Sequence, residues 1–266
     1  MSTKKLFPIF LLAFASTAYG QEEGFEPLFD GKTFEGWTGM GGNPLPSEDW
    51  VIDDGTIRTQ AAHATRGARE GRGWRPRFGG DLRTAGEYTD FDFRFEWKIS
   101  EKGNSGIKYN VQEEWLSDRF RPNMSKQQKA GMTRRAIGFE YQISDDARWD
   151  RSHDDWAKSS TGALYLIKWV DEKPLKPVGE WNTSRIVVKG NHGEHWLNGE
   201  KLVEFEMGSK EMLDQVEKTK FRKMPGYGLK GPGPIVLTHH GSPVWYRNLR
   251  IRAEEPPAVE QGRGPR

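Results

Sequence analysis

Between Phe91 and Ser100 the chain alternates large apolar residues with charged ones (FDFRFEWKIS). The side chains of a β-strand point to its two faces in turn, so this order puts aromatic residues on one face and charges on the other. The pattern predicts a half-buried strand with one face against a core and the other in water. Ser105–Gln112 follows closely and is expected to be its partner strand.

The rest of the chain consists of short apolar runs separated by turn residues. Its 31 Gly and 15 Pro suit many short strands joined by turns. Asp53-Asp54-Gly55 and Asn198-Gly199 are hairpin signals, because these residue types accept the positive φ of tight turns. One helix is expected, with Ser209 as its N-cap and Lys210–Lys220 as its body. Further strands are expected within Asp49–Gln60, Ala163–Trp169, Ser184–Gly190, Glu194–Glu206, Pro234–His240 and Val244–Arg252.

Many strands, one short helix and no alternation of strands with helices predict an all-β protein, a β-sandwich or jelly roll. The sequence shows no internal repeat and no linker, so a single domain is expected over residues 25–252. The Pro-, Gly- and charge-rich segment 253–266 is expected to be a disordered tail.

Residues 1–20 have the pattern of a secretory signal peptide. Lys4 and Lys5 precede the apolar run Leu6–Ala15, and Ala18-Tyr19-Gly20 is a small-x-small cleavage site before Gln21. An uncleaved anchor is the alternative, but the run is too short to span a bilayer and no other run qualifies. The chain has no Cys, so neither a lipid anchor at the cleavage site nor a disulfide can form. We therefore expect a secreted or periplasmic protein that is not a lipoprotein and has no stable membrane insertion.

The charge balance argues against a nucleic-acid partner. Lys and Arg number 40 against 38 Asp and Glu, a formal net charge of +2. Arg66–Gly80 and Glu114–Arg135 are basic insertions, and we interpret them as solvated loops that flank a site. The 11 Trp residues can fill a core or serve as stacking platforms for flat ligands.

The run GFEYQISDD, Gly138–Asp146, places polar residues on one face of a predicted strand. Glu140 and Gln142 alternate with Phe139, Tyr141 and Ile143, so the carboxylate and the amide share a face. Polar and aromatic side chains on the exposed face of a sheet suit a polar, ring-shaped ligand. Sugars are such ligands, so a glycan partner is expected.

Nine segments occur in an order typical of a known family: Phe25–Trp37, Trp50–Gly55, Tyr88–Trp97, Asn104–Tyr109, Phe139–Asp145, Gly179–Asn182, Trp196–Gly199, Ile235–Gly241 and Tyr246–Ile251. Together they resemble the 3-keto-disaccharide hydrolase family, which comprises 3-keto-glycoside 1,2-lyases and 3-keto-2-hydroxy-glucal hydratases. The resemblance covers residues 25–252 and implies a concanavalin-A-like jelly roll and a role in glycan breakdown. Where the family commonly has Gln-Asp-His before a Gly, this chain has Thr238-His239-His240, which keeps one His and replaces the acid.

The resemblance implies a sugar already oxidised at C3, whose ketone acidifies the proton on C2. Such chemistry requires a base, a donor for the oxyanion and an acid for the leaving group. Glu140 is the candidate base or metal ligand, and His240 the candidate acid, base or metal ligand. His239 faces the other way if the strand stays regular, and a bulge would exchange the two.

The remaining candidates bind substrate or metal. Asn104 and Gln142 could bond sugar hydroxyls, and Tyr109, Tyr165 and Trp181 could stack on a sugar ring or serve the core instead. No cofactor is required by any motif, but a divalent metal is compatible with Glu140, His240 and Asp145. A non-catalytic, lectin-like module is the alternative function, since this fold serves both roles.

Overall fold

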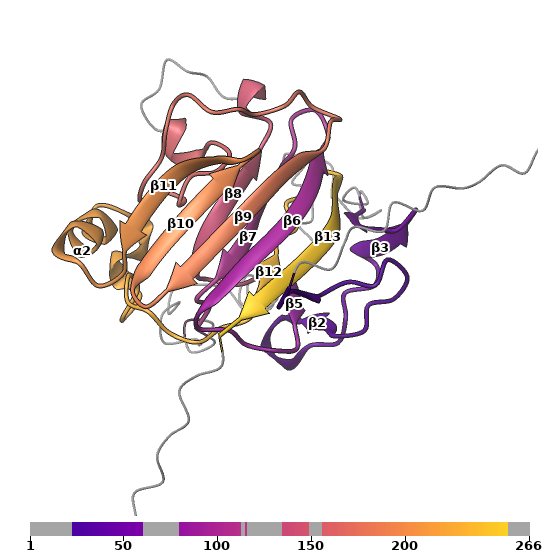
Figure 1. The fold of residues 1–266 in the computed structure, drawn as a ribbon, viewed down its shortest axis with the longest axis horizontal. Helices are drawn as coiled ribbons and strands as arrows, with labels where there is room; N and C mark the ends of the chain where they lie inside the picture. The colour runs from indigo at the N-terminus through magenta and orange to yellow at the C-terminus, as the bar shows by residue number, and fades with distance from the viewer. Residues whose placement is uncertain (1–22, 61–79, 113–114, 116–134, 149–155, 255–266) are drawn as a thin grey trace, which may run out of the picture.

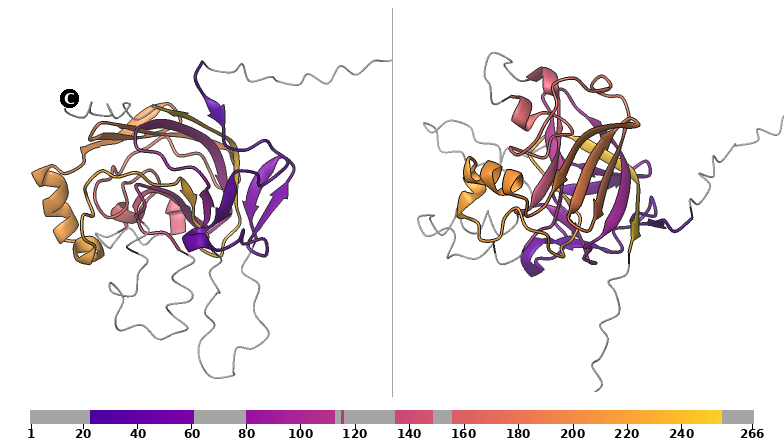
Figure 2. Two further views of the ribbon diagram at one scale, coloured as in Figure 1. Left: turned by 90° about the horizontal axis from the view of Figure 1, so that it is seen from below. Right: turned by 60° about the vertical axis from the view of Figure 1, so that its left-hand side comes forward.

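The computed structural model describes residues 23–60, 80–112, 115, 135–148 and 156–254. The predicted signal peptide, almost all of the two basic insertions and nearly all of the tail lie outside the described residues. Two antiparallel sheets face each other, and the larger curves over the smaller (Figures 1 and 2). No helix in the described part is long and apolar enough to cross a membrane.

The larger sheet is built on the alternating strand. This strand, β6 (Phe91–Ile99), pairs with a strand on each side and not with Ser105–Gln112, which belongs to the other sheet, so the expected pairing is wrong. In sheet order the strands are β11 (Glu200–Glu206), β10 (His192–Leu197), β9 (Asn182–Lys189), β6 (Phe91–Ile99), β13 (Val244–Ala253), β4 (Thr56–Thr59) and β3 (Trp50–Asp53), with β1 (Glu26–Pro27) beside β13.

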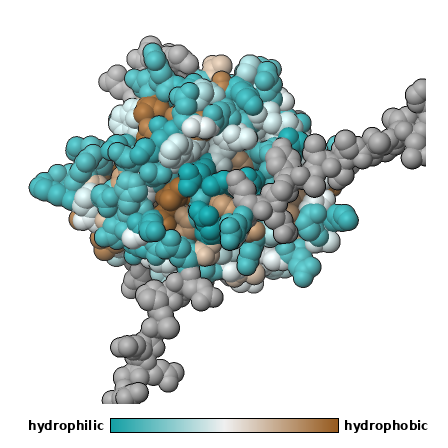
Figure 3. Space-filling model, in the orientation of Figure 1, coloured by the Kyte–Doolittle hydropathy of each residue, from teal (hydrophilic) through white to brown (hydrophobic). Residues whose placement is uncertain are grey.

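The outer face of β6 is charged, as its sequence predicts, and Figure 3 shows that this side of the molecule is mostly hydrophilic. Asp92 and Glu96 are nevertheless buried there, because arginines of neighbouring strands cover them. Arg185 forms a forked pair with Asp92 at 2.8 and 2.9 Å, and Arg247 bonds Glu96 at 2.7 Å. Part of the charged face that was expected to contact water is therefore covered by salt bridges.

The smaller sheet holds the polar strand 139–144. Phe139, Tyr141 and Ile143 are fully buried between the sheets, so Glu140 and Gln142 turn to the opposite face. In sheet order the strands are β2 (Trp37–Gly39), β5 (Leu82–Thr84), β12 (Val236–Leu237), β7 (Asn104–Tyr109) and β8 (Phe139–Ser144).

A buried polar network crosses the core between the sheets. Ser184 on β9 contacts both Trp97 Nε1 and the Tyr141 hydroxyl at 2.8 Å. Tyr109 on β7 donates to His195 Nε2 on β10 at 2.7 Å, and His195 Nδ1 donates to a backbone carbonyl at 3.0 Å. Each polar group has a partner, so these bonds fix how the sheets lie on each other.

The expected helix is present but shorter. Ser209 accepts the N–H of Met212 as an N-cap, and α2 spans Lys210–Glu217. Thr219 then bonds the carbonyl of Val216 and accepts the N–H of Phe221, which ends α2 and begins the 3-10 turn η6 (Lys220–Lys223). The remaining described 3-10 turns are η1 (Met40–Gly42), η4 (Asp146–Arg148) and η5 (Ala157–Ser159).

Ala163–Trp169 is not a strand, which corrects the prediction. Leu166 has a φ of 66°, and the N–H groups of Ile167 and Lys168 both donate to the carbonyl of Leu164. The segment is therefore a tight turn that touches the edge of β8, where Tyr165 N–H donates to the carbonyl of Glu140. The apolar residues that suggested a strand, such as Leu164, pack into the core instead.

Candidate functional site

Neighbouring strands of the smaller sheet bring the candidate residues together. In the register of β7 and β8, Lys108 is opposite Glu140 and Gly106 is opposite Gln142. Cross-strand partners share a face, so all of these side chains turn away from the larger sheet. Thr238, directly after β12, lies beside Gly106, because its N–H donates to the carbonyl of Gly106 at 3.0 Å.

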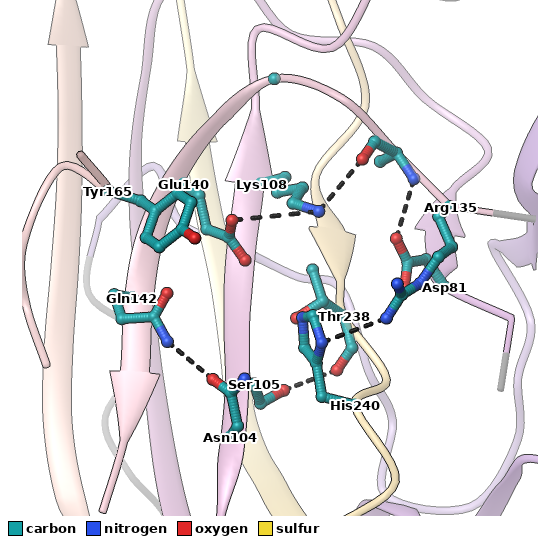
Figure 4. Close-up of polar contacts among 12 residues, drawn as sticks. Asp81, Asn104, Ser105, Lys108, Arg135, Glu140, Gln142, Tyr165, Thr238 and His240 are labelled. Carbon is teal, nitrogen blue, oxygen red and sulfur yellow. Dashed lines mark hydrogen bonds and ion pairs between the residues drawn. The ribbon is translucent and has the colours of Figure 1, made fainter. Parts of the chain in front are cut away.

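The His pair at the end of β12 divides between the two faces. His239 is 1% exposed and packs edge-on against Trp50 in the core. Its Nε2 donates to the carbonyl of Gln60 at 2.9 Å, and its Nδ1 accepts from Gly241 N–H at 3.1 Å. His240 points the other way, to the face that carries Glu140 (Figure 4).

Gly106 lies at the centre of this face, and its missing side chain makes room for Glu140. A Cβ atom at Gly106 would lie 2.5 Å from Glu140 Oε1. The carboxylate therefore leans across the backbone of β7, toward the side on which Thr238 and His240 lie. Only glycine allows this close approach.

Glu140 is a buried carboxylate beside the ammonium group of Lys108. It is 6% exposed, and its Oε2 lies 3.9 Å from Lys108 Nζ. Burial raises the pKa of Glu140, and the charges of Lys108, Lys220 and Arg135 offset only part of that effect. The carboxylate is thus a stronger base than a solvated Glu.

His240 is held neutral by its surroundings. Burial lowers the pKa of His240 well below its ordinary value, and Lys108 and Arg135 add to the shift. Arg135 Nη2 lies 3.1 Å from His240 Nδ1 and 3.4 Å from the carbonyl oxygen of His239. The lowered pKa keeps the ring neutral, and the contact with Arg135 holds it in position.

Asp81 organises the backbone around these groups. Its carboxylate accepts the N–H of Ala136 at 2.8 Å and that of His239 at 3.1 Å. Lys108 Nζ donates to the carbonyl of the same Ala136 at 3.0 Å. One buried carboxylate thereby ties the segment before β8 to the end of β12, which places Arg135 beside His240.

Three of the five predicted substrate-binding residues lie on this face. Gln142 Nε2 donates to Asn104 Oδ1 at 2.7 Å, so the two amides orient each other. Tyr165 lies beside Glu140 in Figure 4, and Lys220 Nζ lies 4.7 Å from the centre of its ring.

The other two predicted rings lie elsewhere, and their placement is corrected. Tyr109 is in the core, because the residues of β7 alternate and Lys108 takes the polar face. Trp181 lies on the outer side of the larger sheet, under Arg247 at 3.9 Å from the ring centre. Sequence spacing could have excluded Tyr109 from the face of Asn104, because the two lie an odd number of positions apart in one strand. The position of Trp181 depends on which strands pair.

Of the three candidate metal ligands, Asp145 does not join Glu140 and His240. Asp145, at the far end of β8 from Glu140, accepts the N–H groups of Lys102 and Ala147, so it caps a turn. Glu140 and His240 are surrounded by Lys108, Arg135 and Lys220, whose charges oppose a divalent cation. The described residues at this face therefore do not fit a divalent metal.

A second group of possible ligands lies on the outer side of the larger sheet. Ligand atoms of His192, Glu194 and Glu204 lie within 4.8 Å of one another. The ammonium group of Lys201 bonds both Glu194 and Glu204, so a cation is already present among them.

Five site residues were not predicted from the sequence: Asp81, Lys108, Arg135, Lys220 and Thr238. Lys108 could have been found, because the period of two puts it on the same face as Gly106 and Asn104. Thr238 is 0% exposed, and within the described part of the chain its Oγ1 has no hydrogen-bond partner. Such a hydroxyl on a polar face indicates a ligand or water contact.

A cavity of about 310 Å³ adjoins Asp81. Its walls come from the loop after β2, including Met40, Leu45 and Ser47, and from Gly80. The site thus has adjacent room for a group larger than one side chain.

The fold is a β-sandwich of the jelly-roll type. One polar face of its smaller sheet carries a buried carboxylate, an imidazole and two paired amides. The family model described as a 3-keto-alpha-glucoside-1,2-lyase-like domain matches residues 24–252. The chain belongs to this family.

Similar proteins agree with this family. The chain is 31% identical over 245 residues to a 3-keto-disaccharide hydrolase of Bacteroides thetaiotaomicron, covering 86% of this chain and 78% of that protein. A crystal structure of a candidate glycosyl hydrolase from Parabacteroides distasonis has 30% identity and a TM-score of 0.66, covering 88% of this chain and 95% of the other. A second structure from that organism, at 24% identity and a TM-score of 0.57, covers 86% and 99% and shares the fold. The protein is therefore an enzyme with a glycosyl hydrolase-like function.

Proposed function

We propose that this enzyme acts on 3-keto-glycosides by elimination at C1 and C2, with water addition completing a net hydrolysis. The observation that carries the proposal is the convergence of Glu140 and His240 on one sheet face, with Lys108, Arg135 and Lys220 around them. A base beside fixed positive charge suits a reaction that generates an oxyanion.

The first step is proton transfer. The carboxylate of Glu140 takes the proton from C2, the C–H electron pair forms a C2–C3 double bond, and the ketone π pair moves to the C3 oxygen. The cations around the site stabilise that negative charge. Glu140 is suited to the task because burial raises the pKa of its carboxyl toward the working pH.

The second step expels the C1 substituent. The C3 carbonyl re-forms, a C1–C2 double bond appears, and the C1–O bond breaks with its electron pair on the leaving oxygen. Protonated Glu140 can return its proton to that oxygen, which restores the carboxylate. Addition of water across C1–C2 then yields the free 3-keto sugar. In this proposal Gln142, Asn104 and the hydroxyl of Thr238 bond sugar hydroxyls.

The test compares a 3-keto-glucoside with the unoxidised glucoside carrying the same aglycone. Only the keto form is expected to release aglycone, because without the C3 ketone the C2 proton is far too weakly acidic for a side-chain base. A parallel assay with a chelator measures any contribution from a divalent ion. Equal turnover of both would indicate a conventional glycosidase, and binding without turnover of either would favour a lectin.

Glu140→Gln provides the matched variant. It is expected to abolish turnover of the keto substrate, since the amide cannot accept the proton. The pKa of Glu140 is raised in the folded state, so the ionised carboxylate disfavours folding as pH rises through that pKa. The neutral amide should therefore leave the Tm at pH 7 unchanged or higher. An active variant, or one that unfolds, contradicts the role.

We also propose export, on the signal-like pattern of residues 1–20. The cell fraction outside the inner membrane should contain a protein that begins near Gln21. N-terminal sequencing that returned Met1 would contradict cleavage.

A further inference from the structure

The contact between Arg135 and His240 determines which ring nitrogen of the histidine carries the proton. A guanidinium group has five N–H donors and no acceptor, so at 3.1 Å from Arg135 Nη2 the Nδ1 atom of His240 must accept. A neutral imidazole has one acceptor nitrogen and one N–H. With Nδ1 accepting, the proton of His240 resides on Nε2.

The surroundings keep the ring in that neutral form. Among the described residues, the charged and titratable groups that act on it include Lys108 on β7, Arg135 before β8, His239 beside it and Lys220 in η6. All of them disfavour a second proton on the ring, and partial burial acts in the same direction.

We propose that Arg135 is a positioning residue that holds His240 as the neutral Nε2–H tautomer, so that His240 donates a hydrogen bond to the substrate oxygen that becomes negative. In this tautomer the ring has no free lone pair with which to take the C2 proton. That proton goes to Glu140, and His240 serves as a neutral donor. The inference rests on the proposed function only for the identity of the oxygen.

The core supplies internal references for both tautomers. His239 donates from Nε2 to Gln60 and accepts at Nδ1 from Gly241, the arrangement inferred for His240. His195 has the opposite one, because Nδ1 donates to Gly162 and Nε2 accepts from Tyr109. One spectrum can therefore contain both patterns beside that of His240.

The direct test is nitrogen NMR of the full chain with ¹⁵N-labelled histidine, at pH 7 and without substrate. The His240 signals are identified as those lost in His240→Gln. They should show the Nε2–H pattern of His239, opposite to that of His195. An Nδ1–H pattern, or an imidazolium at pH 7, would overturn the proposal whether or not the protein turns over a 3-keto-glucoside.

Arg135→Met tests the positioning role. Without the guanidinium group the His240 ring should show both tautomers, and its pKa should rise because one nearby positive charge is gone. With a 3-keto-glucoside as substrate, kcat should fall roughly 10- to 100-fold. In a plot of kcat against pH, the loss of activity on the acid side should begin at a higher pH than in the wild type. Arg135→Lys keeps a positive charge and a hydrogen-bond donor. It should therefore restore part of the Nε2–H tautomer and part of the lost kcat.

Two controls separate a positioning role from a structural one. Unchanged His195 signals report an intact core in each variant. Lys210→Met removes a positive charge on α2 and should change neither the tautomer nor the profile. A wild-type tautomer pattern and acid limb in Arg135→Met would overturn the inference. Absence of keto-glucoside turnover in the wild type would reject the proposed function and leave the tautomer result standing.

Discussion

At the scale of single residues, the side-chain hydroxyl of Thr238 is a polar group whose burial costs stability. It is fully buried on the polar face of the smaller sheet, and no described residue bonds its Oγ1. A buried hydroxyl without a partner costs about 1–3 kcal/mol in protein mutants. The cost is understandable if a substrate hydroxyl provides the missing bond.

We therefore expect Thr238→Val to leave the Tm unchanged or raise it, because the substitution removes only the unpaired polar group. The KM for a 3-keto-glucoside should rise about tenfold, the value of one hydrogen bond of roughly 1.4 kcal/mol. Thermal unfolding and steady-state kinetics on the same preparation measure both. Lower stability with an unchanged KM would show instead that the hydroxyl supports the fold.

At the scale of elements, β7 decides the shape of the site. Its alternation sends Tyr109 and Ile107 to the core and Lys108 and Asn104 to the polar face, with Gly106 between them. The gap at Gly106 is where the Glu140 carboxylate lies. An element can thus shape a site by the side chain that it lacks.

Gly106→Ala should displace the Glu140 carboxylate, because the new Cβ would lie 2.5 Å from Oε1 and 3.0 Å from Cγ. Turnover of a 3-keto-glucoside is expected to fall at least about 100-fold, as a displaced catalytic group does. Gly86→Ala is the matched control, since its Cβ meets only the ring end of Tyr88, at 3.1 Å or more. Comparable activity in the two variants would contradict this account of β7.

Elements were predicted best where local chemistry alone defines them. The hairpin at Asp54-Gly55 forms with both residues at positive φ, and Ser209 caps α2. Ala163–Trp169 failed as a strand because its apolar residues serve a tight turn at a sheet edge. The partner of β6 was also wrong, since neighbours in sequence need not pair when a chain forms two sheets.

For the whole molecule, the polar contacts between the sheets connect stability to pH. Burial lowers the pKa of His195 from 6.5 to about 4. The unfolded chain therefore binds a proton that the folded core rejects between these values. The stabilisation by neutral His195 is complete above pH 6.5 and is lost as pH falls toward 4, by on the order of 3 kcal/mol.

His195→Gln should lower the free energy of unfolding at pH 7 by roughly 2–3 kcal/mol, because the Tyr109 and Gly162 contacts are disturbed. The free energy of unfolding of the variant should also fall less steeply between pH 6.5 and 4 than that of the wild type, since Gln does not titrate. Urea unfolding of variant and wild type at pH 7, 5.5 and 4 measures the difference. Parallel declines would show that His195 is not the group responsible, and His239 and His240, whose pKa values are shifted in the same direction, would be the next groups to replace.

The sequence by itself determined the faces of the strands. A period of two is a local property of a strand. Glu140 and Tyr141 were therefore expected on different faces of their strand, and so were His239 and His240, before any neighbouring strand was known. Tertiary structure alone decided what those faces meet. Asp81 and Arg135 come from segments far from His239 in sequence, and Trp181 lies away from the site because of the strands that pair around it. Pairing joins residues more than a hundred positions apart, and such contacts depend on the energy of the complete core, which no local pattern contains.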